Sequence, residues 1–276
     1  MPRTISPAKY KNNAIRIERE GAKKLRSLIN EWMQEMRKMV IKGLNREIRK
    51  DQAESLVLEL TDWEIVETKG IVKIKPAILD IVAKSGENTT RLFSIEATFD
   101  ALNMQAVQLA ETITATMVRE VTDQTRKGIS YAIRDGLQGG RSIPQIAKSI
   151  KPLVGLTETQ VISVANYEEQ LLIDRPTWNR KQIDRSVNKY ERKKHRQRTQ
   201  TIARTESSTA MNEGSLNVYE SEEVDVEWVA VKGNTFDPEE CQDNDGKIFS
   251  IAEARGRIPV HPNCECLWAP HVEVAA

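Results

Sequence analysis

The sequence predicts an α+β protein that is mainly α-helical, with long N-terminal helices, a helical middle and a small C-terminal β-rich element. Charged residues make up 29% of the 276 residues and aromatic residues only 5%, which favours helical structure over a β-sandwich. Apolar residues recur at three- and four-residue steps through most of the chain before Glu223. After Glu223 the period changes to two, which predicts short strands.

The N-terminal part predicts a flexible basic arm followed by helices. Residues 1–12 contain two prolines and three cations and form the expected arm. An apolar stripe then predicts one long helix over residues 13–49, and we interpret the stripe as core because that is its commoner role. The stripe consists of Leu25, Leu28, Ile29, Trp32, Met33, Met36, Met39, Val40 and Leu44. Further helices are predicted over residues 51–67 and 76–83.

A domain boundary is expected near residue 90. The polar stretch Ser85-Gly86-Glu87-Asn88-Thr89-Thr90 is typical of a break between elements. We therefore divide the chain into an N-terminal helical region, residues 1–90, and a second region, residues 91–276.

The middle of the chain predicts consecutive helices with recognisable ends. Two are expected over residues 100–121 and 122–137, the second ending at Gly139-Gly140. Ser142 with Gln145, and Thr157 with Gln160, have the spacing of capping boxes and predict the starts of two shorter helices.

Lysine and arginine residues are concentrated in residues 180–204. The functional interpretation is phosphate contact with DNA or RNA. The alternative is a solvated helix face, and the lack of interleaved aromatic residues beyond Tyr190 gives base stacking little support. The candidate contact residues are Arg185, Lys189, Arg192, Lys193, Lys194, Arg196 and Arg198.

The helix predicted over residues 201–219 carries small residues that allow another backbone to approach closely. These are Ala203, Ser207, Ala210 and Gly214. Arg204 and Glu206 lie among them and are either a catalytic pair or part of a structural network, which is the commoner role.

The β-rich element is expected over residues 224–270. Its strands are predicted at residues 224–228, 247–251 and 264–268, with turns at Asp245-Gly246 and at His261-Pro262-Asn263. Asp243-Asn244-Asp245-Gly246 imitates part of a calcium loop. The first and twelfth positions would be Cys241 and Ala252, which cannot supply the required oxygen ligands, so we predict a turn.

All three cysteines lie in this element, together with His261. Cys241, His261, Cys264 and Cys266 have the composition of a Cys₃His zinc site. The alternatives are a reduced thiol cluster packed against Trp228 and Trp268, or a disulfide between Cys241 and either Cys264 or Cys266. A cysteine nucleophile with His261 as base is a further alternative, although nothing in the sequence orients the imidazole.

Global properties exclude some classes and leave others open. The net charge of +1 argues neither for nor against a polyanionic partner. The three cysteines are odd in number and clustered, which argues against the disulfide framework of a secreted protein and favours a reducing compartment. No apolar run is long enough to span a bilayer, and the N-terminal residues lack the apolar core of a signal peptide.

Several motifs, in this order, resemble one family. They are Ile202-Ala203-Arg204-Thr205-Glu206, Asn212-x-Gly214, the Trp228 strand, Cys241-x-x-x-Asp245-Gly246 and His261-Pro262-Asn263-Cys264-x-Cys266. Over roughly residues 100–270 the chain resembles the phage Mu F-like head morphogenesis (minor capsid) proteins. Members often have an additional cysteine that would fall at Pro238. If metal binds here, His261 or a residue from elsewhere must therefore replace that ligand.

The resemblance implies a minor head protein of a tailed bacteriophage. Such a protein is made in the host cytoplasm, resides at the portal vertex of the virion head, and acts in head morphogenesis and in genome packaging or delivery. Its expected partners are the portal protein, the major capsid or scaffold protein, and phage DNA. The N-terminal helices lie outside the resemblance, and their amphipathic stripe at Leu25–Leu44 is the reason to expect the portal contact there. No set of acid, base and nucleophile with an orienting partner is readable in the sequence, so we predict that the protein is not an enzyme. The alternatives are a cysteine- or Arg/Glu-based hydrolase or transferase, and a zinc-stabilised DNA-binding module.

Overall fold

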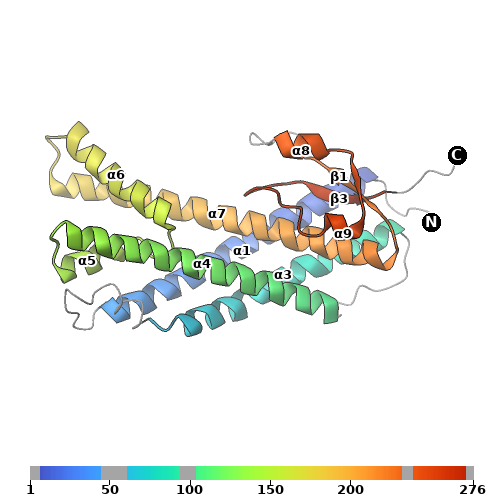
Figure 1. Ribbon diagram of the computed structural model, residues 1–276, viewed down its shortest axis with the longest axis horizontal. Coiled ribbons are helices and arrows are strands. Elements are labelled where there is room, and N and C mark those ends of the chain that lie inside the picture. Colours follow the sequence, from blue (N-terminus) through green and yellow to red (C-terminus); the bar gives the residue numbers. More distant parts are fainter. Residues whose placement is uncertain (1–6, 45–60, 94–103, 232–238, 272–276) are drawn as a thin grey trace. The chain divides into compact units, whose positions relative to one another are not determined.

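The computed structural model describes residues 7–44, 61–93, 104–231 and 239–271, and within them it confirms the predicted fold class (Figure 1). The helices are α1 (Pro7–Leu44), α3 (Trp63–Phe93), α4 (Met104–Gln138), α5 (Ile143–Ile150), α6 (Glu158–Asp174), α7 (Arg180–Ser221), α8 (Glu239–Asn244) and α9 (Ile251–Ala254). The strands are β1 (Val226–Val229), β2 (Ile248–Phe249) and β3 (Leu267–Pro270). None of these helices is long and apolar enough to cross a membrane.

The described residues divide into two compact units that interleave along the sequence. Unit 1 contains residues 1–28, 72–115 and 200–276, and unit 2 contains residues 29–71 and 116–199. Each unit therefore takes segments from both sides of residue 90, and the division predicted there stays a prediction.

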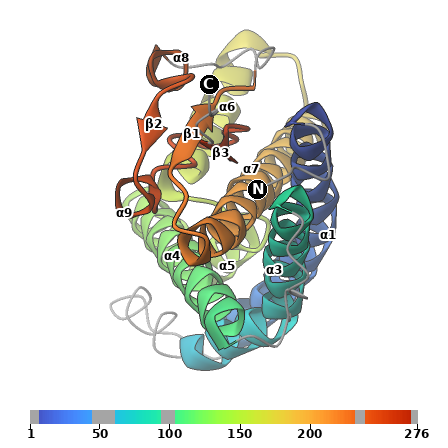
Figure 2. The same cartoon turned by 90° about the vertical axis from the view of Figure 1, so that its right-hand side faces the viewer.

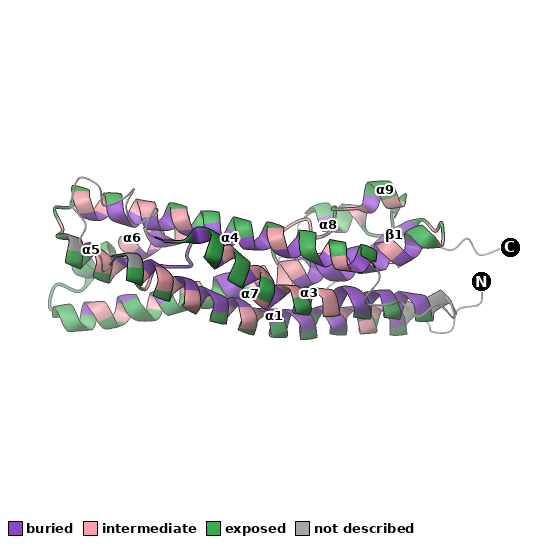
Figure 3. Cartoon of the chain, turned by 90° about the horizontal axis from the view of Figure 1, so that it is seen from below, coloured by how far each residue is buried: buried purple, intermediate pink, exposed green. Residues whose placement is uncertain are grey.

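The long helix α1 confirms that its apolar stripe is core. Leu25, Ile29, Trp32 and Val40 have no exposed surface, and Figure 3 shows buried residues recurring along the helix. In unit 2 the Trp32 indole also donates to the carbonyl of Val66 at 2.8 Å. This stripe is therefore buried and is not itself a contact surface, and portal contact through the N-terminal helices stays a prediction.

Part of the predicted N-terminal arm is helical instead. Helix α1 begins at Pro7, and residues 1–6 lie outside the described residues. Tyr10 is only 2% exposed, and its hydroxyl donates to the carbonyl of Trp268 at 3.3 Å. Tertiary contacts thus order a segment whose local composition predicted an arm.

The break predicted at Ser85–Thr90 is wrong, because α3 runs through it and through the separate helix predicted over residues 76–83. The Ser85 hydroxyl donates to the carbonyl of Met211 on α7 at 2.6 Å, and the Thr89 hydroxyl donates to the Ser85 carbonyl at 3.0 Å. These small polar side chains satisfy their hydroxyls while letting two helices approach closely. The helix predicted over residues 51–67 lies mostly outside the described residues.

The middle of the chain follows its predicted boundaries with one exception. The two helices expected over residues 100–121 and 122–137 are one helix, α4, and within it the Thr125 hydroxyl donates to the Val121 carbonyl at 2.7 Å. Helix α4 ends just before Gly139-Gly140, as predicted. Both capping boxes are confirmed: the side chains of Gln145 and Gln160 accept from the N–H groups of Ser142 and Thr157 at 2.8 and 3.2 Å.

The C-terminal element of unit 1 contains a three-stranded antiparallel sheet in the order β2-β1-β3. Figure 2 shows these strands together with α8 and α9. The Trp228 ring packs edge-on against Trp268, with ring centroids 5.1 Å apart. Phe249 joins this aromatic cluster, with its ring centroid 5.4 Å from that of Trp268.

All three strands differ from their predicted bounds, and β1 begins at Val226 instead of Val224. Residues 264–266 precede β3, and Ile251 begins α9 instead of ending β2. The side chain of Ser250 accepts from the N–H of Glu253, and the Glu253 carboxylate accepts from the N–H of Ser250 at 3.0 Å. This capping box ends the strand after Phe249.

Candidate metal centre

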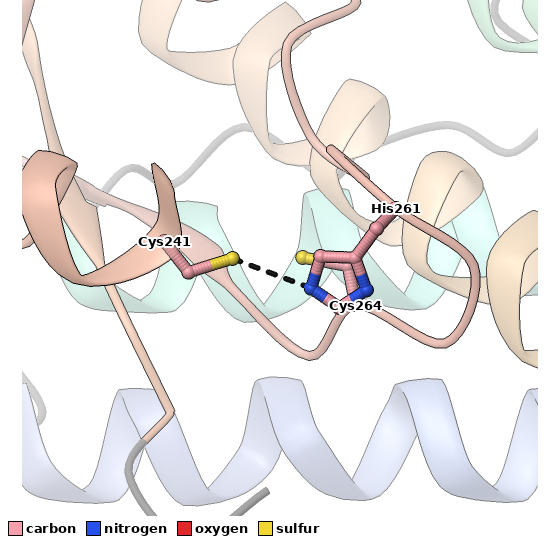
Figure 4. Close-up of side chains that lie close together, drawn as sticks. All are labelled: Cys241, His261 and Cys264. Carbon is pink, nitrogen blue, oxygen red and sulfur yellow. Dashed lines mark hydrogen bonds between the residues drawn. The ribbon is translucent and has the colours of Figure 1, made fainter. Parts of the chain in front are cut away.

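The folded chain brings Cys241, His261 and Cys264 together (Figure 4). Cys241 comes from α8, and the other two flank a turn in which the Cys264 N–H donates to the His261 carbonyl at 3.1 Å. The Cys241 and Cys264 thiols and one imidazole nitrogen all lie within 4.8 Å of one another. Both cysteines are buried and His261 is half-buried.

Cys266 belongs to the same cluster through its thiol. This thiol forms hydrogen bonds with the thiols of Cys264 and Cys241. The hydrogen bond from Cys266 lowers the pKa of the Cys264 thiol to about 5, and the same bond, with burial, raises the pKa of Cys266. All three cysteines are free thiols in this structure.

Helix α7 holds the backbone around this cluster. The Asn212 side chain bridges two backbone groups: it donates to the Cys266 carbonyl at 3.2 Å and accepts from the Trp268 N–H at 3.1 Å. Two residues after His261, the Asn263 N–H donates to the Thr205 hydroxyl at 3.2 Å. Pro262 and Asn263 form the turn itself, with Asn263 at φ 65°. These contacts fix the loop on which three candidate ligands lie.

Arg204 pairs with a carboxylate that sequence reasoning missed. Its guanidinium forms an ion pair with Glu265, which lies between Cys264 and Cys266. Glu206, the other half of the suggested catalytic pair, lies half-buried on α7, two residues from Arg204. Side chains at i and i+2 of a helix point in different directions, so the structural role of Arg204 is favoured.

Glu18 is the second residue that sequence reasoning missed. It is 3% exposed, and burial raises its pKa to about 7, while Arg204 opposes this shift. The periodicity of α1 contained the signal, because Glu18 falls on the helix face that also buries Ala14, Ile17, Ala22 and Leu25.

The remaining motif residues connect other parts of unit 1. The Asp245 carboxylate accepts from the Ala230 N–H at 2.8 Å, and Gly246, at φ 81°, donates to the Trp228 carbonyl at 2.8 Å. Gly214 lies where α7 meets α3, and a Cβ there would stand 2.7 Å from the Val82 carbonyl oxygen.

The candidate nucleic-acid residues all lie on α7, but they differ in exposure. Arg185, Lys189, Arg192, Lys193 and Arg196 are exposed, whereas Lys194 is half-buried with its ammonium 5.0 Å from the centre of the Tyr190 ring. Arg198 is 5% exposed and donates to the Gln124 side chain at 3.1 Å. The expectation that Arg198 contacts a polyanion is therefore corrected, because in this structure its guanidinium is in the interior.

The fold and this cluster define a helical protein whose C-terminal Cys/His element is held on a long helix. A family model described as Phage Mu protein F like protein matches residues 127–269, which is more than half of the chain. The chain belongs to this family, and the membership suggests a bacteriophage protein of head morphogenesis that resides in the virion. No curated protein and no solved structure gives a significant match.

Proposed function

We propose that the chain is a non-enzymatic minor capsid protein that associates with the portal vertex and acts in head assembly. Family membership over residues 127–269 carries this proposal. The disposition of the motif residues supports it. Arg204, Asn212 and Thr205 contact other parts of their own chain, as expected of residues that maintain a fold rather than turn over a substrate.

An apolar patch where α6 meets α7 is the surface we assign to a head protein partner. Leu172 and Ile173 are 52% and 72% exposed at the end of α6, and Trp178 follows at 36%. Large apolar side chains that are clustered and exposed mark interaction sites more often than scattered ones do.

The test is co-sedimentation of the purified chain with portal rings and with procapsids of the same phage. We expect the wild-type chain to sediment with one or both. Ile173→Asp should weaken this binding, whereas Val72→Asp should not, although Val72 is a similarly exposed helical residue at 69%. No sedimentation of the wild-type chain with either assembly would overturn the proposal. Full binding by Ile173→Asp would contradict the assignment of this patch as the contact surface, but not the proposed association itself.

A second proposed function is contact with phage DNA through α7. Successive helix residues are about 100° apart, so Lys181, Arg185, Lys189, Arg192, Lys193 and Arg196 fall within a sector of about 120°. Asp184 and Glu191 fall outside this sector. A single cationic face of this kind suits a phosphate backbone.

A hollow beside this face adds to its positive character. It has a volume of about 520 Å³ and is lined by Arg37, Lys181, Arg185 and Arg192, with Asp184 and Glu191 also present. Burial raises the pKa of Glu191 to about 7, so this carboxyl is partly neutral near neutral pH and repels a phosphate less.

Salt dependence of DNA binding tests this second function. Each phosphate contact adds about 0.9 to the negative slope of log affinity against log salt. Replacing Lys181, Arg185 and Arg192 by Gln should therefore lower the slope by roughly one unit for each phosphate that these side chains neutralise in the wild type. The matched control replaces Arg119, Lys127 and Arg134, three exposed cations of α4, and should leave the slope unchanged. Equal decreases in both triple variants would show that only net charge matters and would end this proposal.

A further inference from the structure

We propose that Cys241, His261, Cys264 and Cys266 bind one zinc ion that joins α8 to the loop before β3. This inference depends neither on portal association nor on DNA contact. The four residues come from two segments, one containing Cys241 and the other containing residues 261–266. A shared ion would therefore connect parts of the element that are otherwise separate in sequence.

The spacing of the ligand atoms fits a tetrahedral zinc ion. With Zn–S bonds of about 2.3 Å and Zn–N bonds of about 2.0 Å, ligand atoms lie roughly 3.5–3.8 Å apart. Cys241 Sγ and His261 Nε2 are 3.4 Å apart, and these atoms and Cys264 Sγ are all within 4.8 Å of one another. Side-chain adjustments of about 1 Å or less would therefore bring these three ligand atoms to tetrahedral spacing.

The imidazole of His261 already has the orientation that a zinc ligand needs. Its Nδ1 lies 3.0 Å from the carbonyl oxygen of Pro262. Because a carbonyl can only accept, Nδ1 carries the proton and Nε2 presents its lone pair toward Cys241. A backbone carbonyl that fixes the tautomer in this way is the usual second partner of zinc-bound histidine.

Cys266 is the proposed fourth ligand. It is buried and follows Cys264 by two residues on the ligand loop, and it lies outside the group of three whose ligand atoms are all within 4.8 Å of one another. Zinc would replace the protons that the three thiols release on binding.

Four protein ligands would make this a structural site. A tetrahedral site of that kind leaves no open position for water or substrate, so the ion would contribute to folding and not to catalysis. The surroundings agree, because Asn212 and Thr205 hold the ligand loop by its backbone.

The test is metal analysis of the full chain, purified without chelator from zinc-supplemented cells. We expect about one equivalent of zinc per chain, and a melting temperature that falls when a chelator removes it. Cobalt should replace zinc and give the visible absorption of a tetrahedral thiolate site. Cys264→Ser and His261→Gln should lose most of the metal. Asn244→Ser, which alters α8 without removing a ligand, should keep it.

Three results would overturn the inference. The first is wild-type protein with less than about a tenth of an equivalent of zinc and no visible cobalt band. The second is an internal disulfide in freshly purified protein, detected by mass as the loss of two hydrogens. The third is a Cys266→Ser variant with wild-type zinc content and an unchanged cobalt spectrum, which would contradict the fourth ligand. The cobalt spectrum reports ligands directly, so it remains informative if a variant is unstable.

Discussion

His195 lies in unit 2, where its surroundings disfavour the protonated ring. Its Nε2 donates to the Pro152 carbonyl at 2.6 Å, and the Arg37 guanidinium lies 3.2 Å from the same nitrogen. Burial lowers the pKa of His195 to about 4; the carbonyl contact opposes this shift, and the charges of Arg37 and Arg198 add to it. The ring is therefore neutral at physiological pH.

This lowered pKa predicts a loss of stability in acid. The unfolded chain binds a proton near pH 6.5, whereas the folded chain does so only near pH 4. The contribution of His195 is therefore complete above pH 6.5 and is lost as the pH falls toward 4, by about 3 kcal/mol. We expect denaturant unfolding at a series of pH values to show this loss in wild type but not in His195→Gln.

Glu191→Gln provides the opposite control. The pKa of Glu191 is raised from 4.5 to about 7, so its contribution is complete below pH 4.5 and is lost as the pH rises through 7. The difference between wild type and this variant should therefore change on the alkaline side. Parallel pH profiles for wild type and His195→Gln would show that His195 titrates normally.

At the scale of elements, the contact between α7 and α3 depends on one missing side chain. A Cβ at Gly214 would lie 2.7 Å from the Val82 carbonyl oxygen, 3.1 Å from the Val82 Cα and 3.2 Å from the Ser85 Cβ. Two of these atoms belong to the backbone, so a rotamer change cannot relieve the clash. The two helices would have to separate.

Gly214→Ala should therefore destabilise the protein, although alanine is the better helix former by about 1 kcal/mol. We expect the free energy of unfolding to fall by about 1–3 kcal/mol, the usual cost of overpacking. Chemical denaturation measures this directly. Gly139→Ala is the control, because Gly139 is exposed just after α4 and a Cβ there would meet mainly its own helix. A Gly214→Ala protein as stable as wild type would contradict the close approach.

For the whole molecule, local patterns predicted elements better than they predicted contacts. The stripe of α1, the two capping boxes and the period-two segment at Trp228 each depend on neighbouring residues, so the sequence alone was sufficient to predict them. The prediction at Ser85–Thr90 was wrong because its polar composition is typical of a loop, whereas the Ser85 hydroxyl is satisfied by Met211, 126 residues away. Tertiary packing makes this segment helical, and the local sequence does not indicate that packing.

The candidate metal ligands could be identified because they are close in sequence as well as in space. The contacts that support them could not be identified from the sequence. Arg204 and Glu265 are 61 residues apart, and Asn212 and Cys266 are 54 apart, so nothing in either segment indicates its partner. The sequence did indicate that Arg204 and Asn212 had a role, through their place in the motifs, but not which atoms they would contact.

The interleaving of the two units has a consequence for the protein while it is still on the ribosome. All of unit 2 is translated by Thr199, whereas the third segment of unit 1 begins only at Gln200. Tyr10 donates to Trp268 across 258 residues, which at roughly 5–20 residues per second takes about 10–50 s to translate. During that time the first turns of α1 have no native partner from the third segment. We therefore expect unit 2 to fold first and the nascent N-terminal helix to depend on chaperones until the last segment emerges.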